Sequence, residues 1–208
     1  MNEVINTDHF VSEAVSIIKS TIAESNEDVF RMSLCGGGTP RPVYEALVNE
    51  AIEWENLEIT FSDERCVPPD HDDSNYKMAA DAFLSKVSIK ENNIIRIKGE
   101  LDSVESASQC EGELRKRSGG SIYVHDLLLL GMGEDGHTAS LFPRTNALNE
   151  SERWVVDNYI PVKDVNRVTF SYPLINASRK ILVLATGEKK KKLVTDMIDG
   201  DEGFPLSL

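Results

Sequence analysis

Asp135 and His137 lie two residues apart in a glycine-rich stretch, residues 131–138 (GMGEDGHT). The stretch follows residues 126–130 (DLLLL), a run that predicts a strand buried on both faces of a parallel sheet. In such sheets, ligands bind at the carboxyl ends of the strands. A histidine beside a carboxylate at this position is placed for proton transfer near neutral pH. A histidine that only satisfies loop carbonyls is the alternative interpretation.

The glycines of the same stretch also match the pattern G-x-G-x-x-G of a dinucleotide-binding turn. That pattern usually opens a βαβ unit, whereas this strand lies far along the chain. Pro143 would also interrupt the helix that should follow the turn. We therefore favour proton transfer over nicotinamide binding and predict no cofactor.

Residues 35–40 (CGGGTP) follow another expected strand, 29–35, and precede an expected helix, 41–51. Consecutive glycines let backbone N–H groups approach an anion, and the following helix N-terminus adds partial positive charge. Thr39 is a plausible N-cap, with Pro40 at the first helical position. No Gly-Lys-Ser/Thr follows, which excludes a Walker A loop. A phosphate cradle and a plain tight turn both remain open.

Charged side chains also gather at two further positions. Residues 62–66 (SDERC) end a strand expected over 57–62, where three charges are costly to bury without a purpose. A solvated loop with a local ion pair is the alternative. Four lysines, 189–192, begin the last expected helix, where the helix dipole disfavours cations. One of them could be held there to meet an anion.

The composition limits the classes of partner. The 208 residues contain 22 Lys+Arg and 35 Asp+Glu, a net charge of −13, which disfavours nucleic acid and anionic membranes. A small anionic substrate is still allowed, because a local cationic pocket acts within a screening length of about 8 Å. Three widely spaced cysteines, without a C-x-x-C pair, predict neither disulfides nor a zinc site. We expect a single-domain, cytoplasmic monomer of residues 1–208.

Helical and strand-like segments alternate along the chain. Apolar residues at 11, 14, 15 and 18 predict an opening amphipathic helix. The remaining segments are expected helices at 74–86 and 103–117 and expected strands at 94–97, 154–160, 168–171 and 180–185. This alternation predicts an α/β fold, a Rossmann-like, three-layer structure with a mainly parallel sheet and helices on both faces.

Taken together, these motifs resemble those of 6-phosphogluconolactonases. The match comprises residues 34–40 (LCGGGTP), 61–65 (FSDER), 74–76 (SNY), 131–143 (GMGEDGHTASLFP), 167–169 (RVT) and 186–190 (TGEKK). Related glucosamine-6-phosphate deaminases share the fold. They typically carry Tyr after the Asp-Glu pair and Glu before the proline of the long motif, where this chain has Arg65 and Phe142. The resemblance therefore favours the lactonases.

The resemblance implies a phosphate-binding group and an active-site set. The phosphate-binding group is Gly37, Gly38, Thr39, Arg167 and Lys190. The active-site set is Asp63, Arg65, Asp135 and His137. It implies hydrolysis of 6-phospho-D-glucono-1,5-lactone, with His137 as general base and then acid and with no metal. Which aspartate orients His137 is open, as is whether Arg65 stabilises the oxyanion or binds phosphate.

Two other classes of function remain. One is an isomerase or deaminase acting on an amino-sugar phosphate, and the other is a non-catalytic sugar-phosphate sensor. The resemblance also implies a last strand and helix after a segment such as 204–207 (FPLS), which we expect to be missing from this chain.

Overall fold

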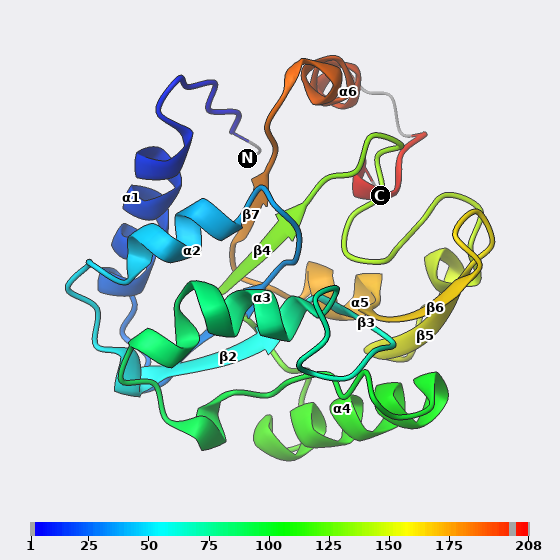
Figure 1. Cartoon of the computed structure of the whole chain (residues 1–208), viewed down its shortest axis with the longest axis horizontal. Coiled ribbons are helices and arrows are strands. Elements are labelled where there is room, and N and C mark those ends of the chain that lie inside the picture. Colours follow the sequence, from blue (N-terminus) through cyan, green and yellow to red (C-terminus); the bar gives the residue numbers. More distant parts are fainter. Residues whose placement is uncertain (1–2, 200–202, 208) are drawn as a thin grey trace.

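A four-stranded parallel sheet forms the centre of the structure, a computed structural model that describes residues 3–199 and 203–207. The strand order is β2-β1-β4-β7. The strands are β1 (Phe30–Leu34), β2 (Leu57–Phe61), β4 (Leu127–Gly131) and β7 (Ile181–Leu184). Helices flank this sheet (Figure 1), which confirms the predicted α/β class.

A second, antiparallel sheet has the order β3-β6-β5. Its strands are β3 (Asp63–Arg65), β5 (Val155–Ile160) and β6 (Val165–Phe170). The sequence predicts strands near β5 and β6 but not their separation from the parallel sheet. Only residues 161–164 connect them, too few for the crossover that parallel pairing requires. The pair therefore folds as a hairpin, with β3 added along β6.

The helices cover the sheets on different sides. In Figure 1, α1, α2 and α3 lie together beside the parallel sheet, and α4 lies on the other side of β2. The α-helices are α1 (Phe10–Ala23), α2 (Arg41–Leu47), α3 (Asn75–Ala82), α4 (Ser103–Arg117), α5 (Tyr172–Asn176) and α6 (Glu188–Ile198). Short 3-10 helices lie at Trp54–Asn56, Leu84–Lys86, Glu91–Asn93, Asn146–Asn149 and Pro205–Ser207. None of the described helices is both long and apolar enough to cross a membrane.

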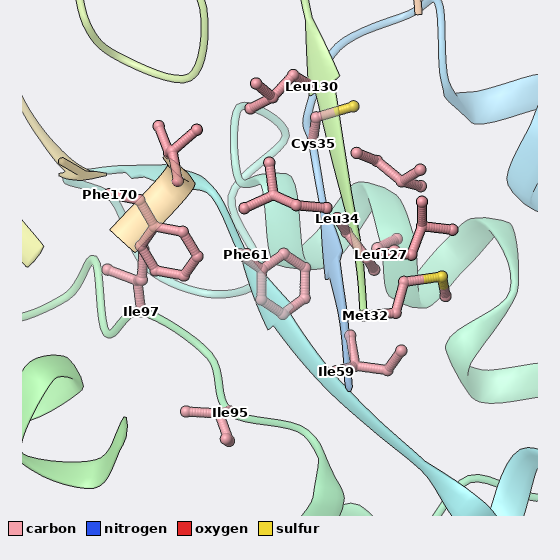
Figure 2. Close-up of a cluster of buried hydrophobic side chains, with 14 of the residues drawn as sticks. Met32, Leu34, Cys35, Ile59, Phe61, Ile95, Ile97, Leu127, Leu130 and Phe170 are labelled. Carbon is pink, nitrogen blue, oxygen red and sulfur yellow. The ribbon is translucent and has the colours of Figure 1, made fainter. Parts of the chain in front are cut away.

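The core explains why β4 is apolar on both faces. All five residues of β2 are buried, as are the four leucines of β4. Figure 2 shows their side chains together with those of the neighbouring strand β1: Met32, Leu34, Ile59, Phe61 and Leu127. This packing holds the strand ends, and hence the loops that follow them, in fixed positions.

Four predictions of local structure are wrong. Residues 94–97 are not a strand, because only Ile94 forms a bridge, with Ile59; the buried isoleucines there pack on the core without a ladder. The helices predicted over 41–51 and 74–86 end at Leu47 and Ala82. Thr39 does not cap α2; its hydroxyl instead lies 3.3 Å from that of Thr186.

Candidate functional site

A cavity of about 210 Å³ opens at the carboxyl edge of the parallel sheet. The loops after β1, β2, β4 and β7 reach this edge together, because the four strands run in the same direction. The cavity is lined by seven of the predicted site residues: Gly37, Gly38, Thr39, Asp63, Arg65, His137 and Lys190. A larger and more open groove, about 840 Å³, follows α1, and its lining includes none of them.

Asp135 holds the imidazole of His137. Its Oδ1 lies 2.5 Å from Nδ1 of His137 and also accepts a hydrogen bond from the His137 backbone N–H, at 3.2 Å. Partial burial raises the pKa of Asp135, but the hydrogen bonds and charge of His137 outweigh it, so the net pKa is lowered. Asp135, rather than Asp63, is therefore the carboxylate that contacts the imidazole of His137 in the structure.

Gly133 makes this pairing possible. A Cβ at position 133 would lie 2.1 Å from Nδ1 of His137 and 2.8 Å from Oδ1 of Asp135. The backbone N–H of Gly133 also donates to the carbonyl of His137 at 2.8 Å, which closes the loop. The middle glycine of the dinucleotide-like pattern, Gly133, thus has a different cause, the space that the imidazole occupies.

The imidazole of His137 is stacked on the ring of Phe142. The ring centroids are 3.8 Å apart and the planes differ by 19°. Nε2 of His137 has no hydrogen-bond partner within the described part of the chain, and the residue lines the cavity. The nitrogen that a base would use is free, while the other is bound to Asp135.

Asp63 has a different role from Asp135. It is only 7% exposed, and its carboxylate accepts hydrogen bonds from Nδ2 of Asn75 at 3.1 Å and from Oγ of Ser140 at 2.7 Å. Its contacts join β3 to the start of α3 and to the loop after His137. Asp63 lines the cavity but forms no hydrogen bond with His137 among the residues described.

Glu64, which the sequence analysis did not single out, anchors the helix α3. Its carboxylate accepts hydrogen bonds from the backbone N–H groups of Asn75 at 2.7 Å and Tyr76 at 2.8 Å and from Oγ of Ser74 at 3.0 Å. Burial raises the pKa of Glu64 against these hydrogen bonds. The buried carboxyl group of Glu64 on β3 therefore stabilises a helix N-terminus, where anions are favoured.

Two arginines face each other across the antiparallel sheet. Arg65 on β3 is the register partner of Arg167 on β6. Burial, and then the adjacent charge of Arg65, lowers the pKa of Arg167. Arg65 donates to the carbonyl of Asp73, whereas the guanidinium of Arg167 forms no hydrogen bond or ion pair with any residue that the structure describes. The nearby carboxylates of Asp63 and Glu64 act on the charge of Arg167 in the opposite sense, so both signs of charge meet here.

The glycine loop after β1 is shaped by its surroundings. Gly37 has φ 100°, which favours glycine, and Gly38 beside it is open to the cavity. A Cβ on Gly36 would lie 1.8 Å from Oδ1 of Asn75. The site architecture therefore also includes Gly36, Asn75, Gly133 and Phe142. Of these four, only Asn75 lies outside the motifs to which the sequence assigned a chemical interpretation.

The geometry defines a class of site: a small pocket at the strand ends, with a histidine–aspartate pair beside a glycine loop. Its wall combines a glycine loop, the ammonium side chain of Lys190 and the histidine. Across residues 3–199 and 203–207, the structure contains no group of three or more His, Cys, Asp or Glu side chains arranged to hold a metal ion.

Comparison with known proteins gives the family. Residues 6–208 match the family described as glucosamine-6-phosphate isomerases/6-phosphogluconolactonase, and the chain belongs to this family. A 6-phosphogluconolactonase of Synechocystis is 41% identical over 179 residues, covering 84% of this chain and 72% of the relative. One from Nostoc is 38% identical over 181 residues, with coverages of 84% and 74%.

Solved structures agree with this assignment. The 6-phosphogluconolactonase of Thermotoga maritima superimposes with a TM-score of 0.88 at 28% identity, covering 98% of this chain and 91% of that one. The enzyme of Trypanosoma cruzi gives 0.84 at 31% identity, with coverages of 95% and 84%. The resemblance inferred from the motifs is thereby confirmed.

Proposed function

We propose that this protein hydrolyses 6-phospho-D-glucono-1,5-lactone to 6-phosphogluconate. The observation that carries the proposal is the Asp135–His137 pair at the edge of an anion-binding pocket, with Nε2 of the imidazole free. The similarity to the 6-phosphogluconolactonases of Synechocystis and Nostoc supports the same reaction.

His137 acts as the acid–base group in this mechanism. The hydrogen bond from Nδ1 to Asp135 leaves Nε2 as the base, which takes a proton from water while the water oxygen attacks the C1 carbonyl. The C1–ring oxygen bond then breaks, and the imidazolium returns the proton to the departing ring oxygen. The ionised Asp135 stabilises the imidazolium between these two steps.

The rest of the pocket binds the substrate. The backbone N–H groups of Gly37 and Gly38, the Thr39 hydroxyl and the Lys190 ammonium are proposed to hold the 6-phosphate. Arg65 lines the cavity close to Asp63 and is the candidate for the charge that develops on the carbonyl oxygen. Arg167 adds positive charge behind it. A lactone is already an activated ester, so the proposal requires no metal.

We further propose that the protein acts as a single-domain monomer in the cytoplasm, in the oxidative pentose phosphate pathway. The proposal for location draws on the acidic composition and on the three reduced cysteines, Cys35, Cys66 and Cys110.

The test is a coupled assay with freshly prepared 6-phosphogluconolactone, 6-phosphogluconate dehydrogenase and NADP, read against the spontaneous rate. Clear acceleration is the expected result. No acceleration by folded protein, together with ammonia release from glucosamine 6-phosphate, would instead assign the deaminase reaction. Binding of 6-phosphogluconate without any turnover would assign a sensor.

A further inference from the structure

The strongest unassigned feature is the aromatic ring that covers one face of the imidazole. Phe142 is 5% exposed and stacks on His137 with centroids 3.8 Å apart. The ammonium of Lys163, in the β5–β6 turn, also approaches the Phe142 ring, 5.1 Å from its centroid. The mechanism above uses neither side chain.

The loop that carries Phe142 is held by buried hydrogen bonds from β5. Nδ2 of Asn158, a residue only 2% exposed, donates to the carbonyl of Ser140 at 2.8 Å and to Oγ1 of Thr145 at 2.9 Å. The Thr145 hydroxyl in turn donates to the carbonyl of Phe142 at 2.7 Å. Asn158 therefore holds the loop by hydrogen bonds on both sides of Phe142, at Ser140 and at Thr145.

The same loop has a strained backbone. Ala139 has φ 47° and Arg144 has φ 64°, both in the left-handed region that non-glycine residues rarely adopt. Such conformations persist only where the surroundings fix them, and they cluster at functional sites. The hydrogen bonds of Asn158 and Thr145 lie between these two residues or next to them and supply that constraint.

The Asp135 hydrogen bond alone does not fix the direction of Nε2. It holds one atom of the ring, while rotation of a histidine ring about χ2 has broad minima. A flat surface parallel to the imidazole, 3.8 Å away, restricts that rotation. It also shields one face of the ring from water.

We propose that Phe142 is a positioning residue for His137 and that Asn158 holds it in place. Together with Asp135, the Phe142 ring confines the imidazole to the orientation in which Nε2 faces the cavity. This inference rests on the proposed function for its kinetic consequence, but the confinement itself is a property of the unliganded protein.

The first experiment is proton NMR of the imidazole rings, which needs no turnover. The chain has four histidines, and His137→Gln assigns the resonance. In the wild type, the Hε1 signal of His137 is shifted upfield by the Phe142 ring. Phe142→Leu removes the shift and broadens the downfield Nδ1–H signal, whereas Phe142→Tyr keeps both. A matched control, Phe10→Leu on α1, leaves them unchanged. An unchanged His137 spectrum in Phe142→Leu would overturn the proposal.

The second experiment is steady-state kinetics with the lactone. Phe142→Leu lowers kcat about tenfold, as expected for a misplaced reacting group. KM stays within twofold, because the phosphate cradle is untouched, and Phe142→Tyr restores kcat. Asn158→Ala also lowers kcat. The kcat of the double variant is no lower than that of the more impaired single variant. A wild-type kcat in Phe142→Leu, or a loss confined to KM, would overturn positioning.

Phe142→Met covers the case in which Phe142→Leu does not fold, because its flexible, unbranched side chain adapts to the space while the flat ring is removed. The proposed function and the proposed positioning role of Phe142 can also be refuted independently of each other. Wild-type protein that shows the stacked, confined His137 but does not hydrolyse the lactone overturns the proposed function alone. Rapid hydrolysis with a freely rotating His137 overturns the positioning role alone.

Discussion

Charged side chains are arranged differently at the two ends of the parallel sheet. At the amino end, the buried carboxylate of Glu58 accepts a hydrogen bond from Tyr123 at 2.5 Å and pairs with Arg117 and Arg31. Beyond the carboxyl end, in the antiparallel sheet, Arg167 is instead the register partner of another arginine, Arg65. Charged side chains at the amino end are buried and paired, whereas at the carboxyl end Asp63, Arg65 and Lys190 line an open cavity.

The same contrast separates two histidines. His125, at the amino end, is fully buried with its Nε2 2.9 Å from the Thr60 hydroxyl. Burial, and then the charge of Arg31, lowers its pKa to about 3. His137 lines the cavity and is paired with Asp135. Residue type alone therefore does not identify the functional histidine; its position at the strand ends and its partner do.

The largest effect in this group of predictions is expected at Gly133. Gly133→Ala places a methyl group where the imidazole of His137 lies, which displaces it from Asp135. We expect kcat to fall about 100-fold, the scale of a displacement of about 1 Å in a catalytic group. The matched control is Gly112→Ala, where a Cβ meets nothing within 4 Å. Gly112→Ala keeps kcat, so equal kcat values for the two variants would refute the steric argument.

Arg117→Ala tests the amino end. The change leaves the buried Glu58 carboxylate without its closest partner, which should cost about 1–3 kcal/mol of unfolding free energy. It should leave kcat unchanged. Urea unfolding measures the loss, and Arg41→Ala, which breaks only an exposed pair with Glu45, is the control and should cost under about 1 kcal/mol. A loss of turnover in folded Arg117→Ala would contradict the conclusion that the two ends of the sheet have separate roles.

Lys190→Ala and Lys180→Ala compare two lysines on either side of β7. Lys190 lines the cavity, whereas Lys180 donates to the Thr21 hydroxyl at 3.0 Å at the other end of the sheet. We expect Lys190→Ala to raise KM about tenfold, a loss of about 1.4 kcal/mol in binding, with little change in kcat. Lys180→Ala should leave KM unaltered. A KM unchanged in both variants would argue against a phosphate contact by Lys190.

The smallest effect concerns pH and His125. The pKa of His125 is about 3 in the folded state, below its ordinary value of 6.5. Between these two pH values, His125 is therefore protonated in the unfolded chain but not in the folded protein. Stability is therefore fully present above pH 6.5 and falls as the pH decreases from there toward 3. Between pH 7 and 5.5 this amounts to about 1 kcal/mol. In urea unfolding, the free energy of unfolding of His125→Gln should lack this part of the pH dependence. The same pH dependence in His125→Gln and wild type would contradict the lowered pKa of His125.

The sequence predicted those features that depend on local pattern. The glycine loop at 35–40 and the Asp135–His137 pair each follow a recognisable strand, so their arrival at one edge of a parallel sheet could be expected. The spacing of two residues placed a carboxylate beside His137, but it did not decide whether Asp135 or Asp63 contacts the imidazole. The strand predicted at 94–97 failed because a short buried isoleucine pattern does not specify a ladder.

Long-range contacts explain what could not be predicted. The capping of α3 by Glu64 requires that β3 and α3 meet in space. The choice between Asp63 and Asp135 depended on where Ser140 and Asn75 lie. The stacking of Phe142 on His137 depends on a strained loop held by another strand, of which the motif gave no signal.

We expect the carboxyl end of the parallel sheet to catalyse the reaction through His137, without a contribution from the amino end. The most direct measurement is the rate of lactone hydrolysis by His137→Ala and by His125→Gln, each against wild type and the spontaneous rate. We expect kcat to fall about 10²- to 10⁴-fold in folded His137→Ala and to stay near wild type in folded His125→Gln. A fall below tenfold in His137→Ala would contradict the claim.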